Sequence, residues 1–156
     1  MLRVSKLSDY AIVLLTEMAQ SGNYRANARL LAAGTNIAQP TVVKLLKQLK
    51  EQGLLSSEQG RHGGYRLARA PSEISLSDII EAVEGPIALT ECIEQDGDCQ
   101  IRPHCAPRSH WVYINAAFRQ ALLTVTLDQL LAPRANRSAH PLGGPSPETP
   151  LLPPSH

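Results

Sequence analysis

The fold is decided by PTVVKLLKQLKEQGLLSSEQGRHGGYRLAR, residues 40–69. Pro40 is favoured in the first turn of a helix and Gly53 is a natural residue to end one, so we expect a helix between them. Polar and basic residues fall on one side of this helix, as in a helix that reads DNA. On the other side, apolar residues recur every three to four positions and predict a buried stripe of Val42, Leu45, Leu46 and Leu49.

A β-hairpin is expected directly after this helix. Residues 54–58 and 65–69 predict two strands, and the glycine-rich residues 60–64 predict a turn with basic side chains at its tip. Before the helix, residues 26–33 predict a shorter helix that stops at Gly34. Two helices joined by a tight turn and followed by a hairpin predict a winged helix-turn-helix, within a mainly α fold.

Further helices are expected on both sides of this unit. The first covers residues 8–20, with Ser8 as its N-cap. Another covers residues 76–84, where Ser75 and Asp78 have the spacing of a capping box. The first carries one apolar face, formed by Leu7, Ala11, Leu14, Leu15 and Met18.

The C-terminal part predicts a long amphipathic helix at residues 109–124 and a short helix at 127–131. The long helix favours pairing with a second copy of the chain, because a dimer places two recognition helices about 34–36 Å apart on one face of DNA. Residues 133–156 hold 7 of the 12 prolines and predict a disordered tail. We therefore expect a DNA-binding domain at 1–70, a cofactor and dimerisation region at 71–132, and the tail.

The net charge of +1 hides a segregation of charge along the chain. Residues 1–70 carry 10 Lys and Arg against 4 Asp and Glu, whereas residues 71–132 carry 3 against 9. A basic first part joined to an acidic second part indicates a polyanion-binding module that has a second function attached.

Composition and motifs exclude several classes of protein. No apolar run reaches the ~18 residues that a membrane span needs, and the N-terminus lacks the apolar block of a signal peptide. We therefore expect a cytoplasmic protein. No phosphate-binding loop, nucleophile elbow or dinucleotide fingerprint is present, so we do not expect an enzyme.

All 3 cysteines, Cys92, Cys99 and Cys105, fall within one loop rich in acidic residues. In the cytosol they are expected to be reduced thiols or metal ligands rather than a disulfide framework. Thiolates are soft ligands that suit Zn²⁺ and iron–sulphur clusters. A structural zinc site usually begins with two cysteines that are two to four residues apart, which is not the case here, so the wider spacing favours a cluster. Zinc, redox thiols and idle thiols remain alternatives.

A cluster generally needs four protein ligands, and this loop supplies only three thiolates. His104 and His110 are nearby candidates for the fourth, as is a residue of a partner subunit. A lone histidine in a loop is more often a solvent-exposed side chain than a ligand.

The sequence resembles the bacterial regulators typified by the cluster sensor IscR and the nitric-oxide sensor NsrR, the BadM/Rrf-two superfamily. It is most similar to the branch that regulates the SUF iron–sulphur assembly operon. The resemblance covers residues 1–131 and does not extend into the tail. It is carried by KLSDYAIVLL (6–15), PTVVKLLKQLKEQGLLSS (40–57), GRHGGYRLAR (60–69), ISLSDIIEAVEGPIALTEC (74–92), and Cys99 and Cys105 before HWVYIN (110–115).

The resemblance implies a homodimeric winged-helix repressor that binds a palindromic operator, senses cluster status and regulates cluster assembly genes. It implies that the three cysteines hold the cluster, for which we expect a 2Fe–2S centre, with a 4Fe–4S centre as the alternative. Some relatives use a histidine three residues after the third cysteine, where this chain has Arg108. In NsrR-like members an acidic residue of the first helix completes the site from the other subunit, and Asp9 matches that position. His110 is the weaker candidate.

For DNA, we expect Gln39, Thr41 and Lys44 to enter the major groove and Lys47 to lie nearer phosphate. At the tip of the hairpin, Arg61 and His62 are predicted to reach the adjacent minor groove. The alternatives with the same DNA-binding part are a zinc- or thiol-based redox repressor and a nitric-oxide-sensing repressor.

Overall fold

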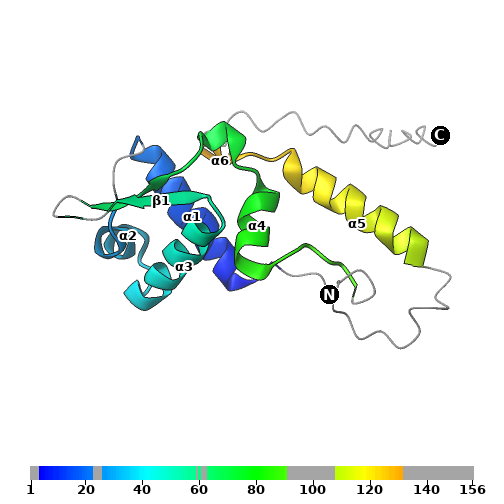
Figure 1. The fold of residues 1–156 in the computed structure, drawn as a ribbon, viewed down its shortest axis with the longest axis horizontal. Helices are drawn as coiled ribbons and strands as arrows, with labels where there is room; N and C mark the ends of the chain where they lie inside the picture. Colours follow the sequence, from blue (N-terminus) through cyan, green and yellow to red (C-terminus); the bar gives the residue numbers. More distant parts are fainter. Residues whose placement is uncertain (1–3, 23–25, 59, 61–62, 91–107, 132–156) are drawn as a thin grey trace, which may run out of the picture.

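The computed structural model describes residues 4–22, 26–58, 60, 63–90 and 108–131. It confirms the mainly α architecture with one antiparallel hairpin (Figure 1). The elements are α1 (Lys6–Gln20), α2 (Ala28–Thr35), α3 (Gln39–Glu51), β1 (Leu55–Glu58), β2 (Gly64–Leu67), the 3-10 turn η1 (Pro71–Glu73), α4 (Leu76–Glu84), α5 (Arg108–Leu123) and α6 (Leu127–Leu131). None of these described helices is long and apolar enough to cross a membrane.

Helix α1 begins earlier than the sequence predicts. Its N-cap is Ser5, whose side chain accepts a hydrogen bond from the Ser8 amide, so the prediction of Ser8 as the cap is wrong. Ser8 is fully buried instead, and its hydroxyl donates to the carboxylate of Glu84 at the end of α4. The physical reason is that Ser5 and Ser8 are both competent caps, and the contact with α4 selects the first of them.

The turn between α2 and α3 also differs from its prediction. Gly34 lies inside α2, which continues to Thr35 and ends at Asn36 in the left-handed conformation, with φ of 56°. Asparagine tolerates this conformation better than most residues, so it can replace glycine as a terminator. At the other end, Asn27 caps the helix by accepting from the Leu30 amide at 2.8 Å. The helix-turn-helix itself is present as expected.

The hairpin follows α3 after Gly53, whose positive φ of 72° fits its expected role as a helix terminator. Leu55 pairs with Leu67 and Glu58 with Gly64, so the second strand ends two residues before the predicted Arg69. Tyr65 also exchanges two backbone hydrogen bonds of 2.9 Å with Ala26, just before α2. These two hydrogen bonds fix the hairpin, which forms the wing, against the start of the helix-turn-helix.

One hydrophobic core joins α1, α3, the hairpin and the later elements. The capping box of α4 is confirmed, since Ser75 and Asp78 exchange bonds of 2.9 and 3.1 Å. The chain then returns after α5: the Leu127 amide donates to Ile74 at 2.8 Å, and the Leu127 side chain is fully buried. We call α1–α4, the hairpin, η1 and α6 together the head. The core of the head takes side chains from residues before and after position 70. The boundary predicted there, between a DNA-binding domain and a cofactor and dimerisation region, is one of function and stays a prediction.

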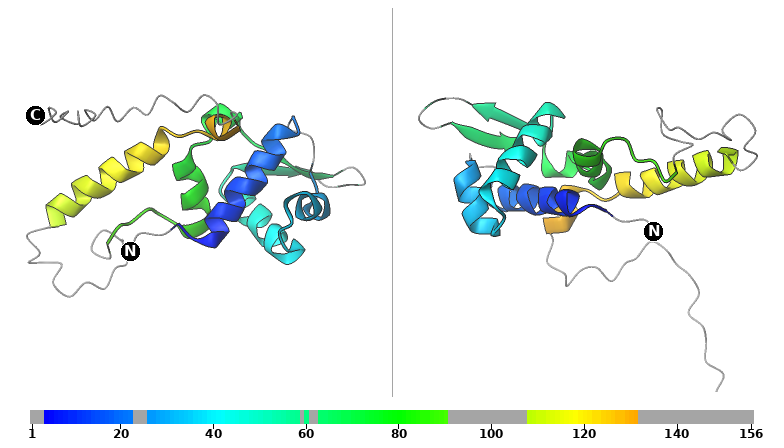
Figure 2. Two further views of the ribbon diagram at one scale, coloured as in Figure 1. Left: turned by 180° about the vertical axis from the view of Figure 1, so that it is seen from behind. Right: turned by 90° about the horizontal axis from the view of Figure 1, so that it is seen from below.

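Helix α5 extends away from the head on the far side of α4 (Figures 1 and 2). Arg119 joins it to α4 through two hydrogen bonds to Glu81, of 2.8 and 3.2 Å, which raise the pKa of Arg119. Several large apolar side chains on α5 are exposed in the single chain: Trp111, Val112, Tyr113, Ile114, Phe118 and Leu123. The amphipathic helix is therefore present as predicted, with much of its apolar surface uncovered.

Candidate nucleic-acid interface

Helix α3 presents a polar face to solvent because its four apolar anchors all point into the core. Val42, Leu45, Leu46 and Leu49 are fully buried. Gln39, Lys44, Lys47 and Lys50 lie on the exposed side of the same helix. The face therefore combines an amide at the N-terminal end with three ammonium groups along its length. This combination suits a helix that reads base edges at its N-terminal end and contacts phosphates with lysines.

The structure brings three of the four DNA contacts predicted on this helix onto this face and leaves one at its edge. Gln39, Lys44 and Lys47 are exposed, whereas Thr41 is half-buried. Lys47 lies 3.9 Å from Glu51, and both side chains are largely exposed, so this surface ion pair is weak and leaves the ammonium available to a phosphate. Within the part of the chain that the structure describes, no carboxylate forms an ion pair with Lys44.

The wing supplies a further cation that was not predicted. Arg66 lies on β2, 3.3 Å from Glu58, and donates to the Ser56 hydroxyl at 3.2 Å. At the tip, the Gly63 amide donates to Gly60 at 2.9 Å and closes the turn. The predicted contacts Arg61 and His62 fall between these glycines and lie outside the described residues.

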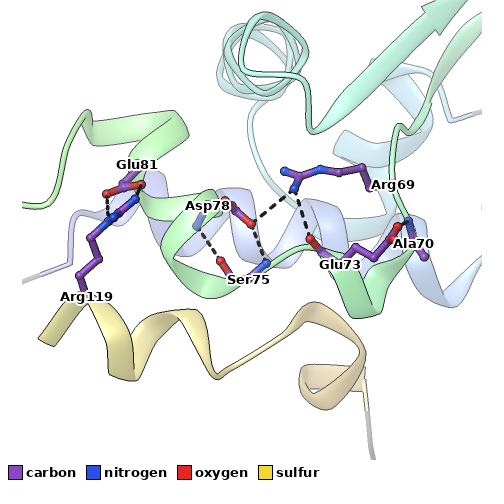
Figure 3. A network of polar contacts seen from close by, with 7 residues as sticks. All are labelled: Arg69, Ala70, Glu73, Ser75, Asp78, Glu81 and Arg119. Carbon is purple, nitrogen blue, oxygen red and sulfur yellow. Dashed lines mark hydrogen bonds and ion pairs between the residues drawn. The ribbon is translucent and has the colours of Figure 1, made fainter. Parts of the chain in front are cut away.

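Arg69 follows the second strand and contacts α4, although 40% of its side chain remains exposed (Figure 3). Its guanidinium lies 3.8 Å from Asp78 on α4 and donates to the carbonyl of Glu73 at 3.3 Å. Arg119 of α5 reaches Glu81 one turn further along α4. Helix α4 therefore contacts the end of the wing through one acidic residue and α5 through the other.

The residues predicted to hold a metal are only partly described. Cys92, Cys99 and Cys105, together with His104, lie outside the described residues. Asp9 is exposed in the first turn of α1, and His110 is exposed in the first turn of α5. Among the residues that the structure describes, no three His, Cys, Asp or Glu side chains form a group that could hold a metal ion.

The segment that leads to the first cysteine is held against α5. We call residues 85–90 the strap. Asn115, a buried polar residue of α5, donates to the carbonyl of Ile87 at 2.9 Å and accepts from the Leu89 amide at 3.0 Å. Sequence analysis missed this residue, although a lone asparagine beside the apolar stripe of a helix is a signal that could have found it.

A cavity of about 410 Å³ lies between the strap, α4 and α5, and Glu84 is its acidic residue. Partial burial raises the pKa of Glu84, but hydrogen bonds from the Ser8 hydroxyl and the Ser5 amide outweigh burial and lower it. The remaining lining is largely apolar: Val4, Ile80, Gly85, Pro86, Ile87, Ala88, Leu89, Phe118 and Leu122. The carboxylate is thus used to join α1 to α4.

A family model described as iron-dependent transcriptional regulators, Rrf2, matches residues 4–133. The chain belongs to the Rrf2 family. It is 30% identical to the regulator NsrR of Geobacillus kaustophilus over 86% of this chain and 93% of that protein. The family consists of regulators, so the expectation that the chain is not an enzyme is confirmed, as is the resemblance to the superfamily.

Solved structures agree with the winged-helix fold. The chain superposes on CymR, the global cysteine regulator of B. subtilis, with a TM-score of 0.65 and 30% identity, over 84% of this chain and 97% of CymR. For T. potens IscR the TM-score is 0.62, at 26% identity and with 83% and 86% of the two chains covered. For the oxidised form of Staphylococcus aureus CymR it is 0.61, at 26% identity over 85% and 98%. The chain is therefore a DNA-binding regulator of the winged-helix type.

Proposed function

We propose that this regulator is a homodimeric repressor that binds a palindromic operator in the cytoplasm and senses iron–sulphur status through its cysteine loop. Its targets are the iron–sulphur assembly genes, as in the SUF branch that the sequence resembles. The observation that carries the proposal is a DNA-binding head linked, through α4 and the strap, to a segment with three clustered cysteines. The description of the matching family as iron-dependent supports it.

The exposed apolar surface of α5 supports the dimer. Trp111 is 38%, Val112 50% and Ile114 43% exposed in the single chain. Exposed tryptophans such as this one are enriched in the cores of protein interfaces. A second copy of α5 is the partner that we propose for this surface, and it would place two α3 helices one DNA turn apart.

The donor set supports a cluster. Three thiolates from Cys92, Cys99 and Cys105 suit iron, with Asp9 of the other subunit as the proposed fourth ligand and His110 as the weaker candidate. A bound cluster, with the 2Fe–2S form favoured over 4Fe–4S, would supply sensitivity to oxidation. The described residues on either side of this loop are anchored: Leu89, three residues before Cys92, donates to Asn115, and α5 begins three residues after Cys105.

The described residues supply a route from this loop to the DNA-binding face. Asn115 joins the strap to α5, Arg119 joins α5 to Glu81, and Asp78 on the same helix contacts Arg69 at the end of the wing. A displacement of the strap or of α5 would therefore reach the wing through α4. Coupling of a few kcal/mol along such a route changes affinity by about 10- to 100-fold.

The deciding experiment is anaerobic purification followed by a visible absorption spectrum and assays of iron and sulphide, repeated on Cys92→Ala. The proposal predicts a coloured protein with iron and sulphide in near-equal amounts, bleached by the substitution. Operator affinity is then compared before and after removal of the cluster. An Asp9→Ala variant with an unchanged spectrum and cluster lifetime would exclude Asp9 as the fourth ligand.

A second candidate function is a thiol- or zinc-based redox repressor, favoured by the likeness to CymR, of which an oxidised form has been solved. It predicts a colourless protein, with zinc or without metal, whose DNA affinity changes when the thiols are oxidised and returns on reduction. A nitric-oxide-sensing repressor, as the similarity to NsrR suggests, predicts instead a coloured protein that nitric oxide bleaches. The spectrum separates the colourless candidate from the two coloured ones, and the response of operator affinity to nitric oxide separates those two.

A further inference from the structure

An apolar side chain lies within the polar face of α3. Val43 is 48% exposed, while every other valine and leucine of this helix is fully buried. It follows Gln39 by one helical turn and precedes Lys47 by one turn, so the three residues lie along one line of the exposed face. Val43 was not among the DNA contacts predicted from the sequence.

Neither core packing nor helix propensity explains why a valine stands at position 43. Its side chain contributes nothing to the core, and a β-branched residue has a lower helix propensity than the lysines around it. An exposed apolar side chain at the centre of a basic, amide-bearing face is instead suited to an apolar group of the ligand. That face binds DNA in the fold to which the chain belongs.

The major groove of DNA offers one such group. The C5-methyl of thymine is the apolar feature of the base edges there, whereas adenine offers a donor and an acceptor that a glutamine side chain can contact together. Residues four apart on a helix have Cβ atoms about 5–6 Å apart, and base pairs are stacked at about 3.4 Å. Gln39 and Val43 can therefore read base pairs that are one or two steps apart.

We propose that Val43 contacts the C5-methyl of a thymine in each half-site and makes affinity depend on that methyl group. The contact is a specificity determinant in addition to the polar readers Gln39 and Lys44. It rests on the proposed DNA-binding function but not on the cysteine loop, since every residue involved lies on α3.

The test uses the full chain, purified anaerobically, and an operator selected from a random duplex library. Each thymine of the operator is replaced singly by deoxyuridine, which removes the methyl group and leaves the base pairing unchanged. We expect one position in each half-site at which the replacement weakens binding about fourfold, the fold-change that corresponds to about 0.8 kcal/mol for one buried methyl-sized group. Fluorescence anisotropy titrations measure the dissociation constants.

Val43→Ala removes both γ-methyl groups and should bring the thymine-to-uracil ratio at that position close to one. Because Val43 lies outside the core, the variant should fold as the wild type does, which circular dichroism checks. Val13→Ala is the matched control: Val13 is 39% exposed on α1, and its variant should keep the fourfold ratio.

Tight binding that ignores every thymine methyl, or a fourfold ratio that survives in Val43→Ala, would overturn this inference and leave the DNA-binding function intact. Failure to bind any duplex would overturn the proposed function together with the inference. The two failures are therefore distinguishable in one set of titrations.

Discussion

The head and α5 satisfy their apolar surfaces in different ways. In the head, side chains from α1, α3, α4 and α6 cover one another, and Leu46 and Leu127 are fully buried within one chain. On α5, Tyr113 is 76% exposed and Ile114 43% exposed. The head can therefore hold its structure through its own contacts, whereas α5 needs another surface to cover it. The difference separates the residues that determine folding from those that determine assembly.

The largest expected effect tests whether α6 belongs to the head. Leu127→Ala should lower the free energy of unfolding by about 2–5 kcal/mol, because it leaves a cavity in the shared core. Urea denaturation followed by circular dichroism measures the change. Leu123→Ala, at a residue 36% exposed on α5, is the matched control and should cost far less. Equal costs for the two variants would contradict the assignment of α6 to the head.

A smaller effect is expected at the proposed dimer surface. Trp111→Ala should weaken dimerisation by about 2 kcal/mol, or about thirtyfold, because buried tryptophans dominate such interfaces. Sedimentation velocity over a range of concentrations measures the dissociation constant. The melting of the head in the dissociated chain should be unchanged. A variant that dimerises as tightly as the wild type would place the interface elsewhere.

The hydrogen bonds between the strap and α5 should contribute less free energy than the dimer contact of Trp111. Asn115→Ala removes two hydrogen bonds, each contributing about 1 kcal/mol, and water can satisfy part of what is lost. We expect amide hydrogen exchange in residues 85–90 to accelerate about tenfold while exchange in α3 stays the same. Exchange measured by mass spectrometry resolves the two segments. Faster exchange throughout the chain would show that Asn115 stabilises the whole fold.

The smallest effect concerns pH. Hydrogen bonds from Ser8 and Ser5 lower the pKa of Glu84 in the folded state despite the opposing effect of burial, so its contribution is present above the unfolded pKa and is lost as pH falls through the folded value. Glu84→Gln should therefore make stability slightly less dependent on pH in the acidic range. Because this carboxylate is exposed, we expect the difference to be small, and Glu73→Gln serves as a control at another exposed position.

Sequence patterns predicted the head well because its determinants are local. The stripe of α3, the terminator Gly53 and the capping box at Ser75 each act within a few residues. The errors arose where distant contacts decide between two local solutions, as when Glu84 contacts Ser8 and the cap moves to Ser5. The place of Asn115 beside the apolar stripe could single it out from the sequence, but its partners could not be predicted, because they depend on how α5 packs against residues 85–90.

After the cysteine loop and α5, the chain comes back to the head at α6. This connection affects how the head folds and how members of the family can diverge. About 40 residues lie between the end of α4 and the bridge that joins Thr126 to Ser75, so closing this excursion costs conformational entropy that grows only logarithmically with its length. Doubling its length would cost only about 0.6 kcal/mol. Insertions, deletions and new ligand sets between residues 91 and 107 should therefore change the free energy of unfolding of the head very little. The contacts between α1 and α6 join segments that are distant in sequence, so they slow the folding of the head. Evolution can therefore exchange the sensor without rebuilding the DNA reader.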